Sequence, residues 1–201
     1  MGLFKRNPFG HILFLKTWLI RIAGFLTHRR YRYFNQLQIE GSEIIRSLPD
    51  TNVLFISNHQ TYFADVVAMF HVFNAALKGR ENNIKNVMYL WNPKLNMYYV
   101  AAKETMQEGL LPRILAYAGA ITVERTWRAK GKDVTEKKEV NPNDTENIKI
   151  ALEDGWVITF PQGTTRSFKP VRKGTAHIIL QHKPVVVPIV IDGFRRSFDR
   201  K

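Results

Sequence analysis

His59 and Asp65 are the two side chains whose types and spacing first suggest acid–base chemistry in this sequence; they lie in the stretch FISNHQTYFADV, residues 55–66. A neutral imidazole can take a proton from a substrate hydroxyl as that hydroxyl attacks a carbonyl carbon. A carboxylate on the other ring nitrogen fixes the tautomer and stabilises the imidazolium. Such chemistry requires no nucleophilic serine or cysteine, and the chain has no cysteine. Taken alone, the pair also fits a loop histidine beside a helix-capping acid.

A second polar stretch, FPQGTTRSF at residues 160–168, carries groups that bind phosphate. Its glycine and backbone N–H groups can form an anion-binding nest. Three hydroxyls and the guanidinium of Arg166 add donors, and an arginine can grip a phosphate through two parallel hydrogen bonds. The alternative is a simple turn with one solvated arginine. Glycine and proline explain a turn but do not explain the clustering of donors.

Strands alternate with helices along the rest of the chain, which predicts an α/β fold with a mixed, largely parallel sheet flanked by helices. The expected strands are residues 52–57, 86–91, 120–125, 156–160 and 185–191, and the expected helices are 62–77, 110–119, 144–155 and 173–182, the third capped by Asp144 or Thr145. The charged segment 126–143 is expected to be an exposed loop. Both polar stretches follow strands, so we expect them to meet at the carboxyl edge of the sheet, where sites collect in such folds.

Four motifs in this order resemble the glycerolipid (lysophospholipid) acyltransferase family, the relatives of 1-acylglycerol-3-phosphate acyltransferase. They are NHQTYFAD at residues 58–65, AGAITVER at 118–125, FPQGTTRS at 160–167 and VVVPIVI at 185–191. The first and third are specific, whereas the second and fourth are weak. Together they span most of the chain.

The resemblance implies a role for each matching residue. His59 is the general base that activates the acceptor's hydroxyl, and Asp65 orients it. The substrate-binding residues, several of them where the family binds the acceptor's phosphate, are Asn58, Arg125, Gln162, Gly163, Thr164, Thr165 and Arg166. The implied acceptor is a lysophospholipid or related lysolipid, and the implied donor is an acyl thioester on coenzyme A or acyl carrier protein. No metal and no cofactor are implied.

The chain departs from the family pattern at three positions. Five residues instead of four separate His59 from Asp65, and one helical step of about 100° could turn the carboxylate away. We expect the extra residue to loop out before the helix, so that Asp65 still contacts His59 Nδ1. In the third motif, Gln162 replaces a glutamate and an extra threonine precedes Arg166. These changes leave the acceptor's head group open.

The N-terminal segment, residues 1–34, is basic and apolar and contains no acidic residue, in a chain whose net charge is +13 and whose pI is near 10.1. On a helical projection Lys16, Thr17, Arg21, Gly24 and His28 share one narrow arc, and most of the remaining circle is apolar. This pattern predicts a helix lying in a bilayer interface, with basic residues reaching anionic head groups. The alternative is a core helix with snorkelling charges.

Two domains are therefore expected: a membrane-associated helical segment at 1–34 and an α/β acyltransferase domain at 35–201. The expected location is the cytoplasmic face of the inner or cell membrane, as a peripheral or monotopic protein bound to anionic lipid. Strand 185–191 is expected at an edge, and residues 192–201 form a basic tail without apolar period. Because an edge strand leaves backbone groups unpaired, we expect a C-terminal truncation whose missing part supplies a pairing strand.

Two alternatives remain open at this point. One is a basic module without catalysis that binds membranes or nucleic acid; a nucleic-acid partner is not expected, because the charge adjoins an apolar helix rather than forming an isolated basic face. The other keeps the acyltransferase fold but has lost the activity. Thioester consumption with and without a lysolipid separates these alternatives from an acyltransferase.

Overall fold

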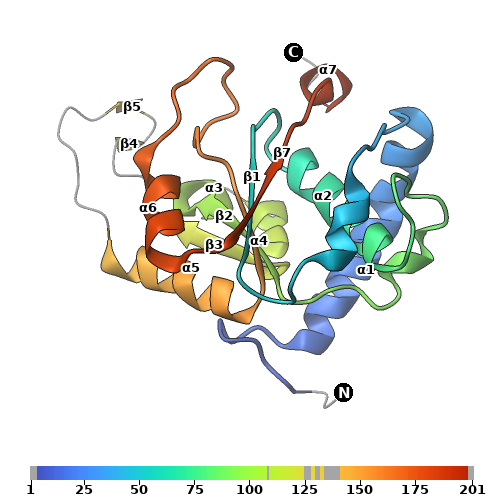
Figure 1. Cartoon of the computed structure of the whole chain (residues 1–201), viewed down its shortest axis with the longest axis horizontal. Coiled ribbons are helices and arrows are strands. Elements are labelled where there is room, and N and C mark those ends of the chain that lie inside the picture. Colours follow the sequence, from blue (N-terminus) through green and yellow to red (C-terminus); the bar gives the residue numbers. More distant parts are fainter. Residues whose placement is uncertain (1–3, 108, 125–127, 130–131, 134–140, 199–201) are drawn as a thin grey trace.

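A five-stranded sheet forms the centre of the protein (Figure 1). The computed structural model describes residues 4–107, 109–124, 128–129, 132–133 and 141–198. The strands are β1 Val53–Ser57, β2 Met97–Ala102, β3 Ala120–Val123, β6 Trp156–Thr159 and β7 Val185–Ile189. Their order across the sheet is β3-β2-β6-β1-β7, and every pairing is parallel. The expected α/β class is confirmed, and the sheet is wholly parallel rather than mixed.

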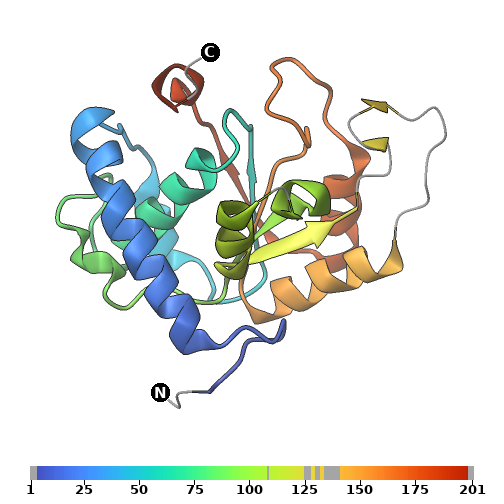
Figure 2. The same cartoon turned by 180° about the vertical axis from the view of Figure 1, so that it is seen from behind.

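Helices cover both faces of this sheet, as the crossovers between parallel strands require. The longer helices are α1 Leu13–Arg29, α2 Ala64–Leu77, α4 Leu110–Tyr117, α5 Pro142–Asp154 and α6 Lys173–His182. Val53 and Phe55 of β1 point into the larger core, toward α1 and α2, whereas Leu54 points into a smaller core under α5 and α6. Figure 2 shows α1 and α4 together on one side of the sheet. This alternation gives each central strand two buried faces.

Short helical elements join the main ones. They are η1 Arg30–Phe34, η2 Ser42–Ser47, η3 Val87–Leu90, α3 Lys103–Gln107 and α7 Phe194–Phe198. Segment 126–143, expected to be a loop, contains a short antiparallel pair, β4 Arg128–Ala129 with β5 Lys132–Asp133. Helix α5 begins earlier than expected, because Asn141 rather than Asp144 or Thr145 is the N-cap and Pro142 occupies the first turn.

The predicted strand at 86–91 is wrong. Val87–Leu90 forms η3, and the strand at this place in the sheet, β2, lies at Met97–Ala102. Asn86 adopts a positive φ of 54° and its side-chain oxygen accepts a hydrogen bond from the Met88 N–H, which starts a helical turn. A short apolar run does not distinguish a strand from a buried helical turn, so the local cap decided the outcome.

Helix α1 turns its polar arc toward the protein and its apolar surface outward. Lys16, Ile20, Gly24 and His28 are its buried residues, while Trp18, Ile22 and Leu26 are among the exposed ones. No helix in the described part of the chain is long and apolar enough to cross a bilayer. The exposed apolar face that the sequence predicted is therefore present, on a helix docked through its polar side.

Lys16 and Arg21 of α1 were expected to reach outward to anionic head groups, but both contact the domain instead. Lys16 is 0% exposed, and its Nζ lies 3.5 Å from the Met97 carbonyl oxygen and 4.7 Å from the centre of the Tyr98 ring. The Arg21 guanidinium lies between the rings of Trp18 and Trp91, and its Nε donates to the Trp91 carbonyl oxygen at 2.9 Å. Both side chains serve to dock the helix, because acceptors and aromatic faces of the domain stand opposite them.

Lys16 should make stability depend on pH. Burial lowers the pKa of its ammonium from 10.5 to about 7, partly opposed by the charge of Asp154. Between these two values the unfolded chain binds more protons than the folded one, so stability should rise with pH across that window. Lys16→Met should raise the free energy of unfolding at pH 7 by about 2–4 kcal/mol and flatten this rise.

Denaturant unfolding of wild type and Lys16→Met between pH 6 and pH 10 measures this effect, with exposed Lys173→Met as the matched control. The control should keep the wild-type pH dependence. An Lys16→Met protein whose stability follows the wild-type curve across the same range would contradict the assignment.

Candidate active site

Two loops meet at the carboxyl edge of the sheet because their strands are neighbours. Ile56 of β1 pairs with Thr159 of β6, so the chain leaves both strands at the same level. The loop after β1 carries His59, and the loop after β6 begins at Phe160. In Figure 1 both loops rise at the top of the view, beside α7. The shared edge expected from the sequence is confirmed.

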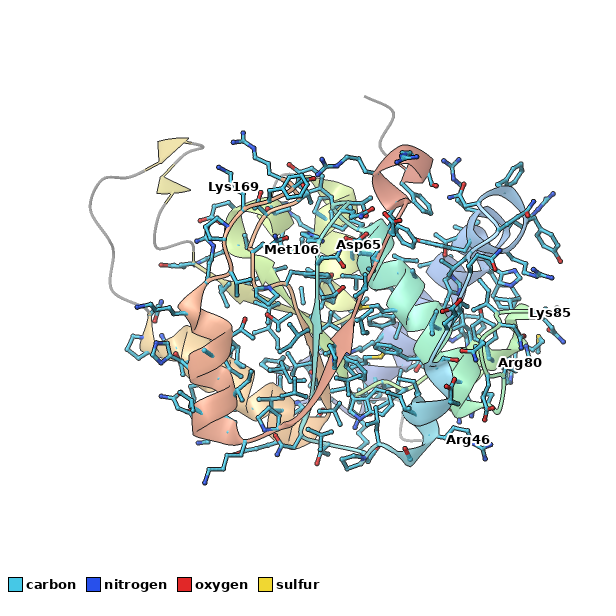
Figure 3. The ribbon with its side chains drawn as sticks, turned by 45° about the horizontal axis from the view of Figure 1, so that its top comes forward. Arg46, Asp65, Arg80, Lys85, Met106 and Lys169 are labelled. Atoms are coloured by element: carbon cyan, nitrogen blue, oxygen red, sulfur yellow. The ribbon has the colours of Figure 1, made fainter. Side chains whose placement is uncertain are left out.

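His59 and Asp65 are in direct contact. His59 Nδ1 lies 2.8 Å from Asp65 Oδ2, which is hydrogen-bonding distance. Helix α2 begins at Ala64, so the extra residue of the first motif lies in the loop before the helix, and Asp65 sits in its first turn. In Figure 3, Asp65 lies near the middle of the molecule, below the loop that carries Lys169. The predicted contact is confirmed.

Asp65 is completely buried, and protein donors surround its carboxylate. Oδ2 accepts the Gln60 N–H at 2.7 Å and the Thr61 N–H at 3.1 Å, and Oδ1 accepts the Thr61 hydroxyl at 2.8 Å. These donors hold the carboxylate in one orientation, with Oδ2 facing His59 Nδ1. When Asp65 accepts the proton on Nδ1, the lone pair of the imidazole lies on Nε2.

Thr61 is a site residue that the sequence analysis missed. Its hydroxyl oxygen also accepts the Asp65 N–H at 3.1 Å, so the two residues bond reciprocally. This exchange resembles a capping box, in which a threonine before a helix and an acid inside it satisfy each other's donors. The threonine four residues before Asp65 was the signal that could have indicated it.

The His59 ring is held flat against Phe160. The ring centres are 4.1 Å apart at an interplanar angle of 23°, and the His59 side chain is 16% exposed. Phe160 opens the third motif, so this stacking joins the two motifs physically. With Nδ1 bonded to Asp65 and one face covered by Phe160, the imidazole has a fixed orientation. Such a histidine is arranged to exchange a proton at Nε2.

The loop after Phe160 is folded by its own polar groups. Gly163 has a φ of +60°, a left-handed conformation that favours glycine, and its N–H donates to the Phe160 carbonyl oxygen at 2.9 Å. The Gln162 side-chain amide donates to the Lys169 carbonyl oxygen at 2.9 Å, and Arg172 Nε donates to the Gln162 carbonyl oxygen at 3.1 Å. A glutamate at 162 could not make the first of these bonds when ionised.

The remaining predicted substrate-binding residues differ in their hydrogen bonds and in their exposure. The Thr164 hydroxyl accepts the Arg166 N–H at 3.2 Å, and Arg166 is exposed. The amide of Asn58 bonds both main-chain groups of Ile191, at 2.7 Å each, so it ties this edge to the segment after β7. Arg125 lies outside the described residues. The roles of these residues toward a substrate stay predictions.

The described part of the chain gathers no three His, Asp or Glu side chains that could hold a metal ion. An apolar pocket lies between α1, α2 and α4, close to the carboxyl edge of the sheet. Phe63, in the first motif, and Val66 and Phe70, in helix α2, line one side of it, and Ile20 and Leu115 line the other. Phe63 is two residues before Asp65, so the pocket adjoins the loop that carries the histidine.

Comparison with known proteins gives one family. The family model described as Acyltransferase matches residues 36–192, a segment that contains His59, Asp65 and the whole loop after Phe160. No curated protein and no solved structure gave a significant match. Because the family match covers well over half of the sequence, this chain belongs to the acyltransferase family that includes the glycerolipid acyltransferases.

Proposed function

We propose that this protein is a membrane-associated O-acyltransferase of phospholipid biosynthesis, in the manner of 1-acylglycerol-3-phosphate acyltransferase. It moves a fatty acyl group from an acyl thioester, on coenzyme A or acyl carrier protein, to a hydroxyl of a lysophospholipid or related lysolipid. The observation that carries this proposal is the 2.8 Å contact between His59 and Asp65 beside the glycine-containing loop, within the segment that matches the family.

His59 is the general base of the proposed reaction. Nε2 takes the proton from the acceptor's hydroxyl as its oxygen attacks the thioester carbonyl carbon, and a C–O bond forms. The tetrahedral intermediate then collapses, the C–S bond breaks, and the imidazolium returns the proton to the leaving sulfur. The products are an ester and a free thiol. Asp65 stabilises the imidazolium between these steps, because its buried carboxylate stands 2.8 Å from Nδ1.

The loop after β6 binds the acceptor's phosphate in this proposal. Its support is chemical: the loop carries the exposed guanidinium of Arg166, the hydroxyls of Thr164 and Thr165, and the left-handed turn at Gly163. Arginine and oriented main-chain amides favour phosphate through charge-assisted hydrogen bonds. The basic surface of a chain with net charge +13 would favour both anionic donors as well.

The apolar pocket between α1, α2 and α4 supports an acyl substrate. Its lining is aliphatic and aromatic, and it begins at Phe63 beside the His59 loop. A fatty chain placed there would leave its thioester near the histidine. Binding would remove the apolar surfaces of the acyl chain and of the pocket lining from water, which is the main driving force for such binding.

Helix α1 provides the proposed contact with the anionic surface of the membrane. Phe14, Leu15, Trp18, Ile22, Phe25 and Leu26 are all exposed on its outer side. Trp91, also exposed, extends this face, because Arg21 lies between its ring and that of Trp18. Large contiguous apolar surfaces of this kind mark interaction sites on proteins. We place the protein on the cytoplasmic side of the cell membrane, without a nucleic-acid partner.

Loss of two exposed apolar side chains should weaken membrane binding. Ile22 is 55% and Leu26 is 76% exposed. Full burial of such a side chain contributes roughly 1.5–3 kcal/mol, so Ile22→Ser with Leu26→Ser should lower the vesicle partition coefficient by at least about tenfold. Cosedimentation with vesicles of phosphatidylcholine and an anionic phospholipid measures this coefficient.

The matched control for this experiment is Leu180→Ser, which removes a 73% exposed leucine from α6, on the opposite face of the sheet. The control should bind vesicles as wild type does. Equal partitioning of wild type and the α1 double variant would show that α1 is not the contact.

The acceptor is tested with a matched pair of lipids. Lysophosphatidic acid and monoacylglycerol both offer a glycerol hydroxyl, but only the first carries a phosphate. We expect thiol release that depends on lysophosphatidic acid or a related phosphate-bearing lysolipid and is much slower with monoacylglycerol. Equal rates with both lipids would contradict the phosphate assignment, and thioester consumption with neither would favour a fold that has lost its activity.

A further inference from the structure

Arg195 is the one residue after β7 that bonds both active-site loops in the described structure. Its main-chain N–H donates to the Gln60 side-chain oxygen at 3.2 Å, next to His59 in the sequence. Its guanidinium donates to the Ser167 hydroxyl at 3.0 Å and to the Thr165 carbonyl oxygen. One residue therefore spans from the histidine loop to the loop after β6.

Aromatic packing on both sides of Arg195 in the sequence fixes its main chain. Phe194 is buried, and the rings of Phe194 and Phe198 pack against Tyr31 with centres 6.3 and 5.1 Å away. The Tyr31 hydroxyl donates to the Ala64 carbonyl oxygen at 2.8 Å, one residue before Asp65. Helix α7 is thus packed onto the same part of α2 that carries the catalytic carboxylate. Arg195 extends from a fixed base.

The histidine loop is also tied to the segment that leads into α7. Gln60 donates from its side-chain amide to the Ile191 carbonyl oxygen at 2.9 Å, while its side-chain oxygen accepts the Arg195 N–H. Asn58 bonds the same Ile191 through both of its amide atoms. Residues on both sides of His59 therefore share their hydrogen bonds with residues 191–195.

The loop that accepts the hydrogen bonds of the Arg195 guanidinium is otherwise exposed to solvent. Residues 166–171 are exposed, and Phe168 adopts a positive φ of 59° with its side chain fully in solvent. Such a segment gains little from burial, so its position depends on polar contacts. A guanidinium fork can hold two acceptors at once, which a lysine ammonium does less well because it is a compact point charge.

We propose that Arg195 is a positioning residue: by holding Thr165 and Ser167, it sets the phosphate-binding loop at the distance from His59 that acyl transfer requires. This inference rests on the proposed function. Arg195 acts through the loop, because the donors described on its guanidinium are directed to Thr165 and Ser167. The substrate's phosphate is bound by the loop itself.

Steady-state kinetics of Arg195→Ala test the proposal. Two charge-assisted hydrogen bonds are lost, so the acceptor KM should rise by about tenfold or more, while the donor KM stays within about twofold. Exposed Arg196→Ala, on the same helix, removes an equal charge and should leave both KM values unchanged. Simple loss of folded protein would lower the apparent kcat and leave the acceptor KM where it was, which would overturn the proposal.

Two further variants separate positioning from direct substrate binding. Arg195→Lys keeps the charge but not the fork, so most of the loss should remain; full rescue by lysine would overturn the proposal. Ser167→Ala made in Arg195→Ala should add less than about twofold to the acceptor KM, because the bond that it removes is already absent. Fully multiplicative effects would show that Arg195 acts independently of the loop.

Hydrogen exchange provides a readout that needs no activity. Amides of residues 164–168 should exchange faster in Arg195→Ala than in wild type or Arg196→Ala. Unchanged exchange would overturn the positioning role of Arg195 while leaving the proposed function standing. Faster exchange in a protein that transfers no acyl group to any lysolipid would instead overturn the proposed function, and with it the role of Arg195 in acyl transfer.

Discussion

Replacing His59 with alanine should lower kcat by about 10²–10⁴-fold, the usual contribution of a general base. The side chain is only partly buried, and its principal contacts are Asp65 and the ring of Phe160. The protein should therefore remain folded while the acceptor's hydroxyl loses the group that removes its proton. Thiol release at saturating donor and acceptor measures kcat directly.

A matched control for this variant is His177→Ala, because His177 is exposed on α6 and lies outside the candidate site. It should retain wild-type turnover. A folded His59→Ala protein with near-normal turnover would exclude His59 as the base.

Asp65→Asn should lower kcat by about 10–10³-fold, less than loss of the base itself. The carboxylate receives four hydrogen bonds, from His59, Gln60 and twice from Thr61. An asparagine has one acceptor oxygen and one donor amide, so it cannot satisfy all four donors. If the amide faces His59, Nδ1 must accept a hydrogen bond and the proton moves to Nε2, where it blocks the base.

The same substitution should also destabilise the fold, because it leaves a buried donor without a partner, which costs about 1–3 kcal/mol. Activity is therefore compared per folded molecule, with circular dichroism measured at the assay temperature. Exposed Glu153→Gln on α5 provides an acid-to-amide control. Turnover of Asp65→Asn equal to that of the control would show that Asp65 does not orient the histidine.

The sequence predicted four of the five strands and the carboxyl edge where the two polar loops meet, because both depend on strong local signals. Buried β1 and β6 are apolar runs followed by polar loops, and parallel neighbours place such loops together. The contact between His59 and Asp65 was suggested by residue type and spacing and supported by the resemblance, but the extra loop residue left two orientations of Asp65 open. The reciprocal bonds of Thr61, which fix Asp65, decide between them.

The orientation of α1 shows that a helical projection gives the polar and apolar faces of a helix but not the direction in which each face points. The separation of polar and apolar residues was visible in the sequence, but not which side faces the domain. Lys16 is buried because the Met97 carbonyl oxygen and the ring of Tyr98 stand opposite it, and both belong to β2, far away in the sequence. Long-range partners of this kind leave no periodic signal.

The end of the chain was described from the sequence as a basic tail without apolar period, and the structure forms the short helix α7 within it, at Phe194–Phe198. Helix α7 is too short to show a period of 3.6 residues, and its stability comes from packing of Phe194 and Phe198 on Tyr31. Strand β7 pairs only with β1 among the described strands, as expected for an edge. The bonds from Arg195 to Gln60 and Ser167 depend on this tertiary packing, so a sequence pattern could not have indicated them.

The most direct test of the account is thiol release from an acyl thioester by purified protein, measured with and without a lysophospholipid and followed by mass spectrometry of the lipid product. We predict that release depends on the acceptor, that each released thiol is matched by one newly acylated lipid, and that His59→Ala loses both together. Release that is indifferent to the acceptor, or a His59→Ala protein that still forms the acylated lipid at the wild-type rate, would contradict it.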